Sequence, residues 1–151
     1  MTSAIETVVI GIGSPFGADQ LGWQIIEQLK NDASLSSNHT IRLEACDRPG
    51  TLLLEYFKNV RKAILIDAIE GGTAGTIRTI DKEQLLQHNS LQSSHQLGVA
   101  ETITLGDRLE LLPDELLVIG VETGETKHAY QPPTGLMREI LDLVTDKIKV
   151  K

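Results

Sequence analysis

The sequence contains very little cysteine, and this excludes two classes of small protein. Its 151 residues include one cysteine, Cys46, so no internal disulfide can hold the fold together and no Cys-x-x-Cys pair can bind zinc. Cys46 lies in an apolar run, which predicts a buried core thiol rather than a nucleophile. A lone thiol suits a reducing compartment, and we expect the protein in the cytoplasm.

Basic runs and long apolar runs are also missing. Lys and Arg number 14 against 21 Asp and Glu, and the formal net charge is −7. This balance argues against a nucleic-acid-binding surface and against a polybasic membrane contact. The first six residues contain no basic region, and the first apolar run is too short to span a bilayer. We therefore expect neither nucleic acid nor membrane as a partner.

What the sequence does contain is a regular alternation of strand and helix patterns. Short apolar or β-branched runs predict five strands, at Thr7–Ile12, Thr40–Ala45, Lys62–Asp67, Thr76–Ile80 and Leu116–Val121. The fourth has alternating character, which is typical of a sheet edge. Helices are predicted from Asp19 as N-cap through Leu29, over 51–58, from Asp81 through Leu86, and over 95–111 and 135–150. The pattern predicts a single domain over residues 1–151. We expect a three-layer α/β/α fold with a twisted, mostly parallel sheet of about five strands and helices on both faces.

Polar side chains follow several of the predicted strands. In open α/β sheets, ligands bind outside the carboxyl ends of the strands. Asp19 and Gln20 follow the first strand, Asp67 ends the third, and His95 precedes a long helix. Carboxylate, imidazole and amide oxygen together can coordinate a divalent metal. Each residue also has a structural interpretation: Asp19 as an N-cap, Gln20 as a first-turn residue, Asp67 as an acceptor for loop amides, and His95 as a helix-start residue.

The glycines after the first strand suggest a second possibility, a dinucleotide-binding loop. Gly11-x-Gly13-x-x-x-Gly17 is one residue too long for the Rossmann fingerprint, and Pro15 removes an amide donor inside the loop. A tight turn with close helix–strand packing explains Gly11 and Gly13 equally well.

Four blocks, taken together, resemble the hydrogenase maturation protease family. The first is Ile10-Gly-Ile-Gly-Ser-Pro-Phe-Gly-Ala-Asp-Gln-Leu-Gly22, which is similar to the family's strand, Gly-x-Gly-Asn turn, acidic pair and glycine. The second is Ile64-Leu-Ile-Asp-Ala-Ile69, the third is Ser93-Ser-His-Gln-Leu97, and the fourth is Val118-Ile-Gly-Val-Glu122. The resemblance covers almost the whole chain, with the blocks in order.

The resemblance implies a fold, an activity and a set of site residues. The family's fold is a twisted sheet between helices, and its members cut a C-terminal extension from a [NiFe] hydrogenase large-subunit precursor once nickel is in place. Its metal-contacting residues fall here on Gln20, Asp67 and His95. Gln20 departs from the family's usual acid, so this set would carry one negative charge instead of two. The segment 47–51 also differs from many relatives and suggests the subgroup that serves bidirectional, NAD-linked hydrogenases.

The implied mechanism needs no organic cofactor. Nickel would arrive with the precursor, held by the precursor's own cysteine thiolates, and Asp67 would act as the general base with support from Asp19. The family is grouped with the aspartic peptidases, and no nucleophile elbow is present. Two alternatives stay open: a non-catalytic nickel checkpoint and a nucleotide-binding α/β module. Peptidyl-tRNA hydrolase, which has a similar opening, requires a histidine soon after the turn, and none occurs between Ser14 and Asn38.

Overall fold

The strands form one five-stranded sheet with the order β2-β1-β3-β5-β4. The computed structural model describes residues 5–13, 20–47, 49–69, 71–88, 97–124 and 134–149. The strands are β1 (Thr7–Gly13), β2 (Ile41–Asp47), β3 (Lys62–Ile69), β4 (Ile77–Asp81) and β5 (Glu115–Glu122). Four of them are parallel, and β4 joins β5 in the antiparallel direction at one edge. The predicted fold class is confirmed, and so is the edge position of the fourth strand.

The two central strands owe their place to their unbroken apolar character. Every residue of β1 and of β3 is buried, because helices cover both faces of the sheet there. In β2, at the opposite edge from β4, Cys46 is the only buried residue.

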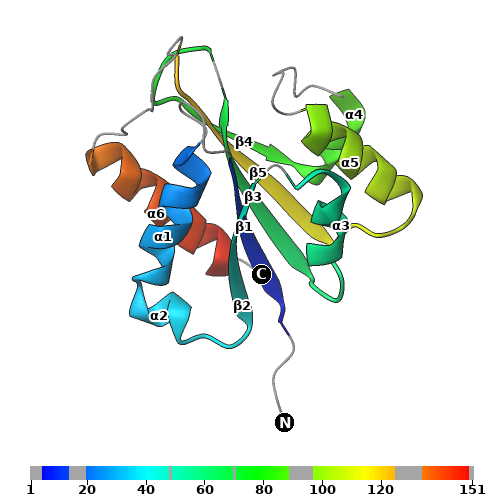
Figure 1. The fold of residues 1–151 in the computed structure, drawn as a ribbon, viewed down its shortest axis with the longest axis horizontal. Coiled ribbons are helices and arrows are strands. Elements are labelled where there is room, and N and C mark those ends of the chain that lie inside the picture. The colour runs from blue at the N-terminus through cyan, green and yellow to red at the C-terminus, as the bar shows by residue number, and fades with distance from the viewer. Residues whose placement is uncertain are drawn as a thin grey trace.

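Helices cover the sheet on both sides (Figure 1). On one face lie α1 (Leu21–Lys30), α2 (Ala33–Ser36) and α6 (Thr134–Lys149); on the other lie α3 (Leu53–Tyr56), α4 (Lys82–His88) and α5 (Leu97–Arg108). Side chains alternate between the faces along each strand. Ile64, Ile66 and Ala68 of β3 therefore pack toward α1 and α6, whereas Ala63 and Leu65 pack toward α3 and α5.

Most element boundaries differ from the prediction by one or two residues, and the helix expected over 51–58 differs by more. The helix expected over 51–58 is a 3-10 turn, η2 (Gly50–Leu52), followed by the four-residue α3, and Asn59 adopts a φ of 61° soon afterwards. Glu110, with a φ of 58°, lies just beyond the end of α5, which is therefore shorter than expected. The strand expected to end at Asp67 continues to Ile69.

The predicted cap at Asp81 is confirmed. The backbone N–H of Gln84 donates to Asp81 Oδ1 at 2.9 Å, and the Gln84 side chain accepts from the Asp81 N–H at 2.9 Å. This reciprocal pair is a capping box, which explains why α4 begins directly after β4.

Candidate functional site

The four parallel strands end at one side of the sheet, which we call the carboxyl-end rim. Its described strand-end residues are Gly13, Asp47, Ile69 and Glu122. Gly13 is in register with Asp47, and Ile69 is in register with Glu122. The rim is where the sequence predicts the site, and it brings together side chains that are far apart in the chain.

Two glycines seat α1 directly against the strands below this rim. A Cβ atom on Gly22 would lie 2.5 Å from the carbonyl oxygen of Ile12 and 2.8 Å from that of Ile66. A Cβ on Gly11 would collide with the Gly22 carbonyl oxygen. Only glycine permits this approach of backbone to backbone. Gly11 and Gly22 therefore allow α1 to pack closely against the strands of the sheet.

Gln20 reaches the rim as a consequence of this packing. It occupies the N-cap position of α1, two residues before Gly22, and is half-buried. Its side chain makes no capping hydrogen bond. Gly22 lies over the carbonyl of Ile66, one residue before Asp67, so Gln20 approaches the end of β3 from the side of the sheet that α1 covers. Their roles in metal contact remain predictions.

Asp67 is a buried carboxylate in the last third of β3. Its exposed fraction is 7%, and it points toward the face that α3 and α5 cover, as Ala63 and Leu65 do. Its register partner on β5 is Gly120, which offers no side chain. A Cβ on Gly120 would lie 3.0 Å from Ile69 Cγ1, so Ile69 occupies the space above that glycine. A carboxylate withdrawn from water beside a glycine suits a group that must meet a substrate.

Two predicted site residues, Asp19 and His95, lie outside the described residues. That the side chains of Asp19 and His95 lie close to Asp67 therefore stays a prediction. The helix α5 begins at Leu97, two residues after His95, and packs on the face toward which Asp67 points. Within the described part of the chain, no group of three His, Cys, Asp or Glu residues could hold a metal ion.

Glu122 ends the fourth of the sequence blocks, and no role is predicted for it. Glu122 is the last residue of β5 and follows an apolar run. The same signal, a carboxylate after an apolar strand, had singled out Asp67. A carboxylate also ends β2 and β4, at Asp47 and Asp81, so this signal alone does not identify a functional residue.

Cys46 is a structural thiol, as predicted. It is buried, and burial raises its pKa, while a hydrogen bond with the Tyr56 hydroxyl acts in the opposite direction. The Cys46 carbonyl accepts a hydrogen bond of 2.8 Å from Trp23 Nε1, which ties α1 to the end of β2. The residue therefore supports the rim and is poorly placed to act as a nucleophile.

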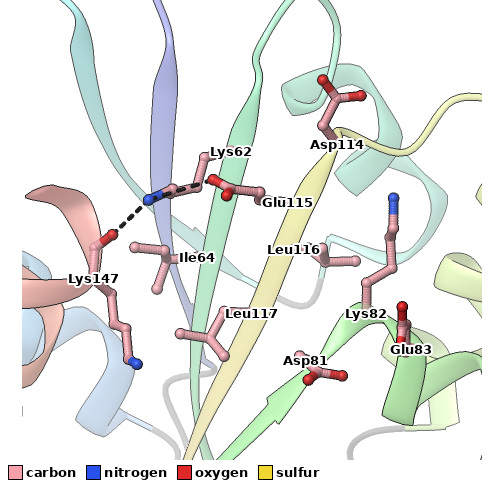
Figure 2. A pocket seen from close by; sticks show the side chains of 10 residues that line it. All are labelled: Lys62, Ile64, Asp81, Lys82, Glu83, Asp114, Glu115, Leu116, Leu117 and Lys147. Carbon is pink, nitrogen blue, oxygen red and sulfur yellow. Dashed lines mark hydrogen bonds and ion pairs between the residues drawn. The ribbon is translucent and has the colours of Figure 1, made fainter. Parts of the chain in front are cut away.

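A hollow of about 420 Å³ lies at the opposite end of the sheet, where β3 and β5 begin (Figure 2). We call it the amino-end groove; its lining residues are Lys62, Ile64, Asp81, Lys82, Glu83, Asp114, Glu115, Leu116, Leu117 and Lys147. Lys62 Nζ donates to the Lys147 carbonyl at 2.7 Å and lies 3.5 Å from Glu115 Oε2. Lys82 Nζ donates to the Pro113 carbonyl at 3.0 Å. These ammonium groups hold the fold together, and the groove is remote from the predicted site.

Comparison with known proteins points in one direction. The family model described as hydrogenase maturation protease matches residues 23–150. The hydrogenase expression/formation protein HupD of Rhizobium leguminosarum bv. viciae is 26% identical over 142 residues, which cover 91% of this chain and 69% of HupD. The corresponding protein HupM of Azotobacter chroococcum is 25% identical over 127 residues, with 82% of this chain and 60% of HupM covered.

Solved structures share the fold at low sequence identity. The hydrogenase maturating endopeptidase HybD from E. coli superposes with a TM-score of 0.74 at 20% identity, covering 96% of this chain and 93% of that one. The [NiFe] hydrogenase maturation protease HybD from Thermococcus kodakarensis gives a TM-score of 0.68 at 14% identity, with coverages of 96% and 100%. No helix in the described part of this chain has the length and apolar character needed to cross a membrane.

Proposed function

Since the chain belongs to the hydrogenase maturation protease family, we propose that it removes the C-terminal extension of a [NiFe] hydrogenase large-subunit precursor after nickel insertion. The observation that carries this proposal is the position of Asp67. It is a buried carboxylate near the carboxyl end of β3, where ligands bind in folds of this kind, and it points to the side of the sheet that α3 and α5 cover.

In the proposed reaction, Asp67 acts as the general base. It takes a proton from a water molecule, whose oxygen adds to the carbonyl carbon of the scissile peptide bond. The carbon–nitrogen bond then breaks, and the departing amine takes up the proton. Asp19 supports Asp67 in this role. The new C-terminus of the mature subunit and a short free peptide are the two products.

Nickel enters this scheme as part of the substrate. We propose that Gln20, Asp67 and His95 contact the precursor-borne nickel directly or through water, so that only a loaded precursor is positioned for cleavage. Amide oxygen, carboxylate and imidazole are suitable ligands for such a contact. The proposed compartment is the cytoplasm, and no organic cofactor takes part.

The proposed activity is tested by incubating the purified protein with a large-subunit precursor, with and without nickel, and measuring the intact mass of the precursor. We expect loss of a C-terminal peptide only in the nickel-loaded sample. Absence of cleavage in both samples, or equal cleavage in both, would contradict the proposal.

Gln20 provides a test of the metal contact itself. Gln20→Glu restores a negative charge and should preserve or accelerate nickel-dependent cleavage, whereas Gln20→Ala removes the oxygen and should slow it. If both variants cleave at the wild-type rate, Gln20 serves only the start of α1.

A further inference from the structure

The strand β2 forms one edge of the sheet, and among the described strands only β1 pairs with it. The Thr7 N–H donates to the Thr40 carbonyl at 3.1 Å, so the backbone groups of Thr40 face β1. Ile41, the next residue, faces the other way, and its N–H donates to the Asn38 carbonyl at 3.3 Å. Because backbone direction alternates along a strand, every second residue after Ile41 also faces away from β1.

Leu43 and Ala45 are the next two outward-facing residues of β2. Each offers one N–H and one C=O along the outer side of the strand, which we call the β2 edge. No hydrogen bond occupies these four groups within the described part of the chain. Ala45 is exposed, and its methyl group is too small to shield the backbone. An uncovered edge of this kind is a template for another extended chain.

The free part of the β2 edge lies toward the carboxyl-end rim. At the far end, the Ile41 N–H is already used by the turn at Asn38. Ala45 lies two residues before Asp47, where β2 ends at the rim. Trp23 Nε1 donates to the carbonyl of the residue between them and holds this end of β2 to α1. A chain that pairs with the β2 edge therefore continues directly onto the rim.

The distance from the β2 edge to Asp67 suits a peptide that is held in both places. A strand added outside β2 would lie three strand spacings from β3, which is about 14 Å. An extended chain covers this distance in about four or five residues, at about 3.3 Å per residue. One peptide can therefore pair with β2 and also bring a peptide bond to the end of β3.

We propose that the β2 edge binds the C-terminal extension of the precursor as an added strand, through the backbone groups of Leu43 and Ala45. The proposal rests on the proposed function and deepens it, because it says where the enzyme holds the substrate peptide. An extended backbone matches a row of alternating donors and acceptors, and main-chain hydrogen bonds supply the affinity. The contact therefore requires an extended segment and places few demands on its sequence.

A second copy of this chain fits the β2 edge less well. A two-fold, antiparallel pairing that uses all four free groups sets Leu43 of each copy opposite Ala45 of the other. This arrangement places the two copies of Glu44 directly opposite each other, and like charges in that position destabilise a strand pair. The charge on β2 thus favours a different chain as the occupant.

The first test removes one donor from the β2 edge. Ala45→Pro deletes an outward-facing N–H, and proline is tolerated there because the sheet does not use that N–H. Thr79→Pro is the matched control on β4, the opposite edge. The Thr76 carbonyl accepts from Glu122 of β5, so the Thr79 N–H, three residues later, faces away from β5. We expect Ala45→Pro to raise the KM for nickel-loaded precursor about ten-fold at a nearly unchanged kcat, and Thr79→Pro to leave both constants unchanged.

Hydrogen exchange tests the same contact in the wild-type protein. The probe is a synthetic peptide with the sequence of the precursor's C-terminal extension, and the measurement is the exchange rate of single backbone amides by NMR. We expect the peptide to slow exchange at Leu43 and Ala45 by about ten-fold or more and to leave exchange at Thr79 unchanged. The contact uses backbone groups alone, so no nickel is needed.

The results separate this proposal from the proposed function. If the wild type cleaves precursor but Ala45→Pro has a wild-type KM, or if the peptide protects neither Leu43 nor Ala45 up to its solubility limit, the edge proposal alone is overturned. An equal rise in KM for Thr79→Pro also overturns it, as does protection of both amides without peptide in a protein of dimeric mass. Should Ala45→Pro lower the melting temperature, the exchange result decides. If the wild type cleaves no loaded precursor, the proposed function fails, and exchange still shows whether the β2 edge binds the peptide.

Discussion

The two ends of the parallel strands are both rich in charge, but the charges serve different purposes. In the amino-end groove, Lys62 and Lys82 are engaged by backbone carbonyls, and Lys62 also lies near Glu115. At the carboxyl-end rim, Asp67 and Glu122 stand among glycines that remove side chains and bring backbones close. The hollow at the amino end is therefore lined by charges that serve the fold, whereas the predicted site lies at the other end of the strands.

A well-formed hollow is a weak guide to a functional site when the charges that line it already have partners. Lys62 Nζ donates to the Lys147 carbonyl and lies 3.5 Å from Glu115 Oε2, so its charge already has partners within the fold. Position relative to strand direction is the better guide here, because the loops that can change without disturbing the sheet lie beyond the carboxyl ends.

The largest expected effect is at the rim. Asp67→Asn removes the proposed base while keeping the shape of the side chain, and we expect the cleavage rate to fall by about 10²- to 10⁴-fold. The measurement is the cleavage rate of nickel-loaded precursor, with circular dichroism to show that the fold is retained. A variant that cleaves at the wild-type rate would remove Asp67 from the mechanism.

The next largest effect is a loss of stability at Gly22, where α1 packs against the backbone of the strands. Gly22→Ala places a methyl group against two backbone carbonyls that cannot move independently of the sheet, and we expect it to lower the free energy of unfolding by about 3 kcal/mol. Urea denaturation measures this.

Gly135→Ala is the control for Gly22→Ala. Gly135 lies in α6 with no neighbouring atom within 4 Å of its would-be Cβ. We expect this change to be neutral or to stabilise by up to about 1 kcal/mol. Equal effects of the two substitutions would show that α1 is not packed as described.

At the amino end, Lys62→Met should affect stability and leave the chemistry intact. The change removes the ammonium that binds the Lys147 carbonyl and faces Glu115, and we expect the free energy of unfolding to fall by about 1–2 kcal/mol. Urea denaturation curves of the wild type and of Lys62→Met measure this loss of unfolding free energy. An unchanged unfolding free energy would mean that the Lys62 contacts contribute nothing.

The smallest effect is the pH dependence at Cys46. Burial raises the pKa of this thiol in the folded protein, so the folded state retains a proton that the unfolded chain loses. Its contribution to stability is complete below the ordinary thiol pKa of about 9.0 and is lost as the pH rises through the folded pKa. Cys46 also raises the pKa of Tyr56 through their hydrogen bond, which acts in the same pH range with the same sign.

The pH effect is measured by comparing denaturation of the wild type and Cys46→Ala at pH 8 and pH 10. We expect the wild type to lose more stability between these two values than the variant does. Parallel losses in both proteins would place the titration elsewhere.

Much of the fold was predictable because each strand and helix has a strong local pattern. The continuous apolar runs of β1 and β3 and the amphipathic α6 gave the correct elements in the correct order. The failures lie where tertiary contacts override the pattern. The segment 51–58 has helical composition but makes only one turn of α-helix before Asn59 turns the chain.

The site was less predictable than the fold. Strand direction predicts that Gln20 and Asp67 lie near the carboxyl ends of the parallel strands; the structure has Gln20 at the start of α1 and Asp67 in the last third of β3, and their common role stays a prediction. The relation of Glu122 to Asp67 depends on register: only the pairing of Ile69 with Glu122 shows that the two carboxylates share a face. Register between strands separated by some fifty residues cannot be read from local sequence patterns.

The most direct test of the account compares Asp67→Asn and Lys62→Met in one assay of nickel-loaded precursor cleavage, with each rate divided by the amount of folded enzyme. We expect Asp67→Asn, at the carboxyl-end rim, to lose cleavage while remaining as stable as the wild type. We expect Lys62→Met, in the amino-end groove, to be less stable but to cleave at the wild-type rate. A fully active Asp67→Asn beside an inactive, well-folded Lys62→Met would contradict it and move the site to the other end of the sheet.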